Sequence, residues 1–163
     1  MTRSRVAALS LFGAGAIAWA AIAFLDRDRS LERPLRSGVL RVAYAVEPPY
    51  AYVGADGQVT GESPELARRV IGGLGIPEVR FIQTEFGSLL PGLQAGRYDV
   101  VASGMFITPE RARVVSFSIP TFRVRQGLLV REGNPRDLHS YRDAVASPEV
   151  RVAVVSGSVE ETL

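Results

Sequence analysis

Cysteine and lysine are absent from this sequence of 163 residues, and histidine occurs once, as His139. Without cysteine the chain cannot form disulfides, use a thiolate in catalysis, bind a metal through sulfur or carry a lipid on an N-terminal cysteine. One histidine does not supply a histidine-based metal centre, and we interpret His139 as a loop residue. We therefore expect neither a metal nor a cofactor.

A large excess of charge is also lacking. All nineteen basic residues are arginine, seventeen acidic residues are interspersed among them, and the net charge is +2. This pattern offers no basic stripe for nucleic acid, and we attribute the exclusive use of arginine to a genome-wide compositional bias. Hydrophobic residues make up 47% of the chain, which is enough for a packed core and argues against disorder.

The longest hydrophobic run lies at the N-terminus. Val6 to Leu25 contains no charged residue and follows Arg3 and Arg5. Its twenty residues can span a bilayer, but a charged start followed by small residues also fits an export signal, with cleavage sites at Ala18-Trp19-Ala20 or Ala21-Ile22-Ala23. A signal peptide and a membrane anchor over residues 1–25 are both open. In either case we expect the rest of the chain to be extracytoplasmic.

Residues 26–38 are charged and are interpreted as a linker, so that the folded part begins near Val39. Beyond it, strand-like and helix-like hydrophobic periods alternate, and Ala55-Asp56-Gly57-Gln58 predicts a hairpin turn. The longer predicted elements are strands over Leu40–Tyr44, Val79–Thr84 and Tyr98–Ala102, a helix from Ser63-Pro64-Glu65 to Gly75 with Ser63 as its cap, and a helix over Ser88–Ala95. Strands that alternate with helices imply parallel pairing with right-handed crossovers, and hence an α/β fold.

The C-terminal part of the sequence continues this kind of pattern. Thr121–Arg131 predicts a long strand, Ser140–Ala146 a short helix, and Arg151–Ser156 a further buried strand. Gly157-Ser158 is expected to begin another helix.

Three loops follow the first three predicted strands. They are Glu47–Tyr50, Glu85–Gly87 and Ser103–Arg111. Because ligands in open α/β sheets bind beyond the carboxyl ends of the strands, we expect these loops to meet around a site. Pro48 and Pro49 should keep the first loop rigid and extended.

The segment Gly104–Ser118 combines turn, helix-start and charge signals. Thr108 can cap a helix and Pro109 pre-sets its first turn. Arg111 then lies close to free backbone N–H donors just after a buried strand, which outlines an anion site. The alternative is that Arg111 forms a surface ion pair with Glu110 or another nearby acid.

Several motifs occur together in this part of the chain. They are Glu47-Pro48-Pro49-Tyr50, Gly61-Glu62, Glu85-Phe86-Gly87-Ser88-Leu89, Gly96-Arg97-Tyr98-Asp99, Gly104-Met105, Ile107-Thr108-Pro109-Glu110-Arg111 and Phe117-Ser118. Over Val39 to the end, the chain resembles the extracytoplasmic solute-binding proteins of polar amino-acid importers, and Gly104–Arg111 is the most specific part of that resemblance. Within this family it looks most like the branch that binds ectoine and hydroxyectoine.

The resemblance implies a periplasmic-binding-protein-like lobe, with a mostly parallel sheet flanked by helices, over residues 39–125. It implies a hinge crossing and an incomplete second lobe over residues 126–163. Members of this family close two lobes over the ligand, and Ser158 is the one group of the second lobe that we expect to reach it. Without the rest of the second lobe, water should remain over the site and weaken its charge contacts with the ligand.

The resemblance also implies the chemistry of the site. Ectoines are small zwitterions with a carboxylate and a delocalised ring cation. Arg111 would hold the carboxylate, helped by backbone N–H groups around Gly104, and Glu47 would pair with the ring nitrogens. An aromatic box around the cationic ring would consist of Tyr50, Phe86 and Phe106. Phe106 is the telling position, because many amino-acid receptors of the wider family carry a small polar residue there.

Structural roles for these residues remain open as alternatives. Phe86 and Phe106 could belong to the core, Tyr50 could wedge its loop, and Glu47 could be a solvated acid. Our leading interpretation is a receptor, not an enzyme, that delivers its ligand to the membrane subunits of an ABC importer. The alternatives are a receptor for polar amino acids, a dehydratase-like enzyme with Glu47 as general acid, and a sensor or structural remnant.

Overall fold

The computed structural model describes residues 30–162, and the chain divides into two compact units, Met1–Gly38 and Val39–Leu163. In the first unit the expected linker contains a short helix, α2 (Glu32–Ser37), which ends at Gly38 in the left-handed conformation with φ of 71°. The predicted signal peptide or anchor over residues 1–25 lies outside the described residues. Within residues 30–162 no helix is long and apolar enough to cross a membrane.

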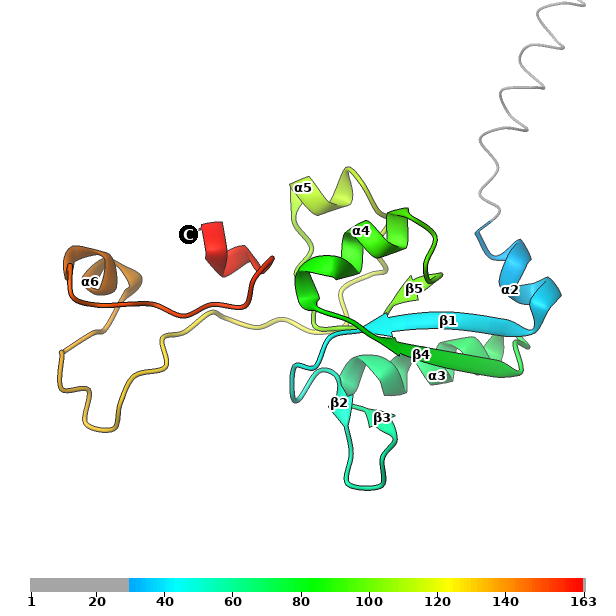
Figure 1. The fold of residues 1–163 in the computed structure, drawn as a ribbon, viewed down its shortest axis with the longest axis horizontal. Helices are drawn as coiled ribbons and strands as arrows, with labels where there is room; N and C mark the ends of the chain where they lie inside the picture. The colour runs from blue at the N-terminus through cyan, green and yellow to red at the C-terminus, as the bar shows by residue number, and fades with distance from the viewer. Residues whose placement is uncertain (1–29, 163) are drawn as a thin grey trace, which may run out of the picture. The chain divides into compact units, whose positions relative to one another are not determined.

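The second unit is built on a three-stranded parallel sheet (Figure 1). Its strands are β1 (Val39–Tyr44), β4 (Glu78–Gln83) and β5 (Val100–Val101), in the order β4-β1-β5. Both pairings of the central strand β1 are parallel, with Val39 opposite Glu78 and Val42 opposite Val100. The predicted α/β fold with a parallel sheet is therefore confirmed.

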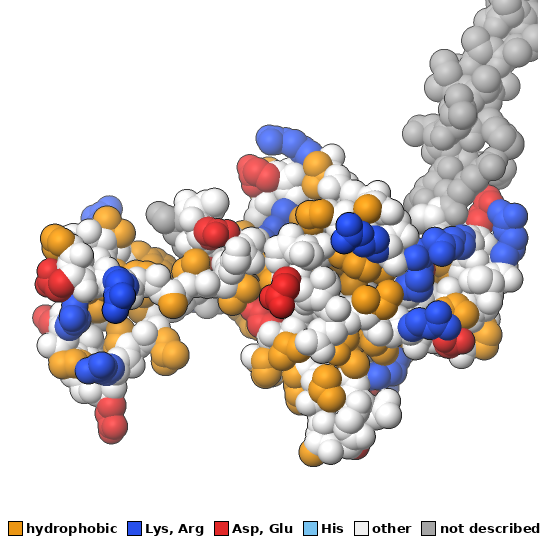
Figure 2. Space-filling model, viewed as in Figure 1, with side chains coloured by type: hydrophobic (Ala, Val, Ile, Leu, Met, Phe, Trp, Pro, Cys, Tyr) orange, Lys and Arg blue, Asp and Glu red, His pale blue; other side chains and the backbone are white. Residues whose placement is uncertain are grey.

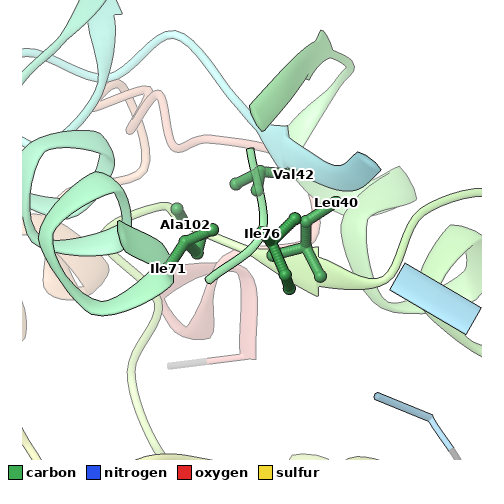
Figure 3. Close-up of a cluster of buried hydrophobic side chains, with 5 residues drawn as sticks. All are labelled: Leu40, Val42, Ile71, Ile76 and Ala102. Carbon is green, nitrogen blue, oxygen red and sulfur yellow. The ribbon is translucent and has the colours of Figure 1, made fainter. Parts of the chain in front are cut away.

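Hydrophobic residues of β1 pack on both faces of the sheet because alternate side chains of a strand point in opposite directions. Leu40 and Val42 form one cluster with Ile71, Ile76 and Ala102, shown in Figure 3. Ile71 belongs to helix α3 (Glu62–Gly73), so this cluster joins α3 to the sheet.

The second cluster fills the opposite face. Ala43 of β1 and Ala45, which follows the strand, pack there with Phe86, Leu89 and Tyr98. Phe86 lies in the 3₁₀ helix η1 (Phe86–Ser88), and Leu89 begins helix α4 (Leu89–Gln94). In Figure 1, α3 and α4 accordingly lie on opposite sides of the sheet.

Tyr98 and Gly92 fix α4 against the chain that leads into β5. The Tyr98 hydroxyl donates to the carbonyl oxygens of Ser88 at 2.8 Å and Leu89 at 2.6 Å. A Cβ atom at Gly92 would overlap the Tyr98 ring and its hydroxyl, so only glycine fits here. This contact is one reason why the sequence needs a glycine within a helix, where it otherwise costs stability.

The hairpin predicted around Asp56 and Gly57 is present. Strands β2 (Tyr52–Val53) and β3 (Val59–Thr60) pair antiparallel, and the Gln58 N–H donates to the Asp56 carboxylate at 3.0 Å. The predicted cap of the following helix is wrong, because α3 begins at Glu62 with Gly61 before it. Gly61 has φ of 116° and lies against the backbone of Tyr50, so the close approach of two loops sets the start of α3.

The C-terminal segment has fewer regular elements than its sequence predicts. Helix α6 (Tyr141–Ala146) is present as expected, and the Ser140 side chain caps it by accepting from the Asp143 N–H at 3.3 Å. The predicted strands over Thr121–Arg131 and Arg151–Ser156 are absent. A strand needs a neighbour for its N–H and C=O groups, and in the described part of the chain neither segment has one.

Hydrophobic side chains of this segment stay on the surface, where Figure 2 shows them among charged ones. The residues concerned include Val124, Leu129, Val145, Val152 and Val154. Arg151–Ser156 was expected to be buried, but all six of its residues are exposed. The helix expected after Gly157-Ser158 is a single 3₁₀ turn, η2 (Val159–Thr162).

Candidate functional site

The loop after β1 is held in shape by its own backbone. The N–H of Tyr50 donates to the Glu47 carbonyl at 2.8 Å, and the Glu47 N–H donates to the Ala51 carbonyl at 2.7 Å. The carbonyl of Tyr50 in turn accepts from the Ser63 N–H at 3.0 Å, which ties the loop to the start of α3. This double attachment fixes the position from which the Tyr50 side chain projects.

Gly104 brings the loop after β5 against the Tyr50 ring. A Cβ atom built on Gly104 would lie 2.6 Å from Cγ and 2.7 Å from Cδ2 of Tyr50. Any other residue would push the ring away, since such distances are well below van der Waals contact. Two of the three loops expected to converge therefore do so, at Tyr50 and Gly104.

Arg111 is positioned by the helix-start signal that the sequence contains. Helix α5 (Pro109–Ala112) begins after Thr108, whose side chain accepts from the Arg111 N–H at 3.3 Å. The Arg111 guanidinium donates from Nη1 to the Phe106 carbonyl at 3.0 Å. Its Cζ lies 5.7 Å from the centroid of the Phe86 ring. The alternative ion pair with Glu110 does not form among the described residues.

The aromatic residues of the expected box are not equivalent. Phe86 is only 8% exposed and is mainly a core residue of the second cluster, although its ring also faces Arg111. Phe106 is half-buried and contributes its carbonyl oxygen to Arg111. Within residues 30–162 no ring contact joins Tyr50, Phe86 and Phe106 to one another.

Glu47 carries an unsatisfied polar atom. Its Oε2 is buried and has no hydrogen-bond partner in the part of the chain that the structure describes. Burial raises the pKa of Glu47, and the negative charge of Glu160 raises it further. An unpaired buried oxygen costs free energy, so a donor supplied by a ligand would be favourable at this position.

The C-terminal turn contributes groups next to Arg111. The Gly157 carbonyl accepts from Arg111 Nη2 at 2.9 Å. Gly157 has φ of 78°, and a Cβ atom there would lie 2.5 Å from the Cα of Gly87. Ser158 Oγ is buried close to the Glu160 carboxylate. The close approach of Gly157 to Gly87 joins the loop after β4 to the same region.

Burial and a nearby carboxylate have opposite effects on the pKa of Arg111. Burial lowers the pKa of Arg111, while the Glu160 carboxylate opposes that shift. Burial acts to raise the pKa of Glu160, but hydrogen bonds, including one from Gln126 Nε2 at 2.7 Å, and the charge of Arg111 bring it below its usual value. Glu160 thus interacts electrostatically with both Arg111 and Glu47.

Sequence reasoning missed Phe122 and Glu160. The Phe122 ring stacks on Tyr50, with centroids 5.0 Å apart and planes 10° apart. Neither residue carries a local signal, because each reaches the site through the path of the chain after α5. The position of Phe122 in the sequence gives no indication of its contact with Tyr50, which only the fold creates.

Comparison with known proteins assigns the class. The sequence matches the bacterial extracellular solute-binding proteins, family 3, over residues 40–156, and the chain belongs to this family.

Among its relatives, a probable amino-acid ABC transporter periplasmic-binding protein, y4tE of Sinorhizobium fredii, is 41% identical over 157 residues. The alignment covers 95% of this chain and 49% of y4tE. The chain therefore spans about half the length of this relative.

Two solved structures are similar in fold and in sequence. EhuB in complex with hydroxyectoine has a TM-score of 0.72 and 37% identity, over 83% of this chain and 52% of EhuB. The ancestral amino acid-binding protein AncCDT-1, a precursor of cyclohexadienyl dehydratase, has a TM-score of 0.75 and 36% identity, over 82% of this chain and 58% of AncCDT-1. The periplasmic-binding-protein fold is thereby confirmed, for a part of its usual length.

Proposed function

We propose that this chain is the extracytoplasmic solute-binding component of an ABC importer and that it binds ectoine or hydroxyectoine. Family membership and the likeness to y4tE support the transport role. The likeness to EhuB, whose structure contains hydroxyectoine, supports the ligand class. Its partners would be the membrane subunits of the importer, reached after export through, or anchoring by, residues 6–25.

The single observation that carries the proposal is that Arg111 keeps unused N–H donors on the group of converging loops that also carries the unsatisfied Oε2 of Glu47. Arg111 uses one N–H for Phe106 and one for Gly157, out of the five that a guanidinium offers. The remaining donors can bind a ligand carboxylate in a charge-assisted contact. Such a contact contributes about 1.5–3 kcal/mol.

The cationic end of the ligand would meet Glu47 and the aromatic rings. The unpartnered Oε2 of Glu47 can accept from a ring N–H of ectoine, which removes the cost of leaving that oxygen unpaired. The Tyr50 and Phe106 rings would supply π faces, each worth on the order of 0.5–2 kcal/mol for a desolvated cation. Phe86 would contribute through Arg111, because its ring is largely buried in the core.

A binding titration of the full chain tests this proposal. We expect ectoine to bind, and Arg111→Ala to weaken binding roughly 10- to 100-fold, since the carboxylate loses its charge-assisted contact. Isothermal titration calorimetry measures both affinities. The matched control is Arg113→Ala, which removes an exposed arginine from the end of the same short helix and should leave the affinity unchanged.

L-Arginine serves as the competing ligand in the same titration. Binding of arginine without binding of ectoine would replace the ectoine assignment by a receptor for polar amino acids, in keeping with the amino-acid transporter named for y4tE.

A dehydratase is the second candidate, because the pKa of Glu47 is raised as a general acid requires. AncCDT-1, itself an amino acid-binding protein, is a precursor of cyclohexadienyl dehydratase, so binding and dehydration occur among related chains. Turnover of a prephenate-like acid, lost in Glu47→Gln, would establish this activity. Absence of turnover together with ectoine binding would leave the receptor.

A further inference from the structure

The Tyr50 ring, proposed above as a wall of the ligand site, already packs against two neighbours. Phe122 stacks on it almost in parallel, with ring centroids 5.0 Å apart. Gly104 approaches the base of the same ring so closely that not even a methyl group fits between them. A ligand that stacks on the face of Tyr50 covered by Phe122 must therefore displace Phe122.

Phe122 is the neighbour that can leave. It remains 38% exposed in spite of the stack. It belongs to a stretch, residues 121–131, that forms neither helix nor strand. Gly104, by contrast, lies in the loop after β5 (Val100–Val101) and has no side chain to rotate. Rotation of Phe122 about its χ angles exposes the Tyr50 face without moving the backbone of the site.

The charge of the incoming ligand decides whether it replaces Phe122 favourably on the Tyr50 ring. Phe122 is neutral and gains only an aromatic stacking contact from Tyr50. A delocalised cation on the same face gains the attraction of the ring quadrupole as well. Two carboxylates, those of Glu47 in the Tyr50 loop and of Glu160, would also attract a cation. They would not attract a neutral phenyl ring.

We propose that Phe122 is a resident occupant of the ligand-stacking face of Tyr50, which an incoming cationic ring must displace. Phe122 thereby selects against neutral ligands, because these gain no more from Tyr50 than the phenyl ring they replace. This inference rests on the proposed function, since it takes the Tyr50 face to be part of the ligand site.

The affinity of Phe122→Ala tests the proposal through its sign. If Phe122 competes with the ligand, its removal should tighten binding roughly two- to tenfold, the equivalent of one lost stacking contact. If Phe122 instead forms a wall of the site, its removal should weaken binding. The control is Ile119→Ala, which removes an exposed side chain three residues before Phe122 and should leave the affinity unchanged.

A spectroscopic variant keeps the test independent of that substitution. Phe122→Trp, in a chain whose Trp19 is replaced by phenylalanine, carries a single tryptophan at the stack. Displacement by ectoine should move this tryptophan into water and shift its emission to longer wavelength. A shift to shorter wavelength, or none at saturating ectoine, would overturn the displacement.

Titrations with ectoine and with L-arginine separate this inference from the proposed function. Tighter binding of ectoine to Phe122→Ala supports both. If only arginine binds, and binds more tightly to Phe122→Ala, the occupant role stands and the ectoine assignment fails. Weaker or unchanged binding to Phe122→Ala overturns the occupant role alone. Absence of binding of both compounds to both chains overturns both.

Discussion

Residues 39–112 and residues 121–162 contain similar hydrophobic patterns but differ in what those patterns become. In the first region, β1 alternates Leu40 and Val42 with other residues and lies between two parallel neighbours. In the second, Val152 and Val154 alternate in the same way and remain exposed, without a strand. Periodicity therefore indicates a capacity for pairing, and a strand results only where a neighbour satisfies the backbone.

The largest difference between the two regions should appear in a matched pair of leucine substitutions. Leu89 is 0% exposed and Leu129 is 101% exposed. Leu89→Ala should lower the free energy of unfolding by about 2–5 kcal/mol, because it leaves a cavity in the second cluster. Leu129→Ala should change it by less than about 0.5 kcal/mol. Urea unfolding measures both, and equal effects would break the comparison.

Glycine substitutions sharpen the comparison at a smaller scale. Gly92→Ala should cost about 1–3 kcal/mol, since the new methyl group displaces the Tyr98 hydroxyl from its two carbonyl acceptors. Gly127→Ala, in the second region, has open space around its Cβ position and should be close to neutral. Thermal unfolding ranks the destabilisation of the two variants. A destabilising Gly127→Ala would mean that other groups pack around Gly127, which contradicts the open space in the structure.

The smallest expected effect is the pH dependence of Glu47. Its raised pKa means that the folded chain holds this proton more tightly than the unfolded chain, so stability is lost as pH rises from the ordinary pKa of a glutamate through the raised one. Glu47→Gln should therefore stabilise the ligand-free chain at neutral pH, by less than about 1 kcal/mol, and the gain should vanish in acid.

Unfolding curves at neutral and acidic pH measure this gain. Exposed Glu132, in the second region, provides the control, because Glu132→Gln changes a side chain that is not buried and should leave stability nearly unchanged. A gain from Glu47→Gln that persists in acid would rule out titration of this carboxyl as its cause.

Local signals predicted much of the first region. The β1 alternation, the turn around Gly57 and the Thr108-Pro109 helix start all correspond to elements of the structure. Each depends on contacts within a few residues, or on a strand that finds its partners. The predicted Ser63 cap failed because the start of α3 is set by the approach of Gly61 to Tyr50, which is a contact between loops.

The candidate site was predictable only in part. Arg111 could be identified from its place after a helix cap, and Gly104 and Tyr50 from motifs that resemble a family. The assignment of these residues to ligand binding stays a prediction. Phe122 and Glu160 could not be identified, because they approach the site only through the path of a chain segment without regular structure.

The meeting of Gly87 with Gly157 has a consequence for evolution of the site. Here two main-chain segments touch with no side chain between them, and Arg111 donates to the carbonyl of Gly157. Substitution of side chains elsewhere on either loop leaves this main-chain contact unchanged. In the receptor proposed above, the preferred ligand can therefore change during evolution while the backbone beside the Arg111 guanidinium stays constant.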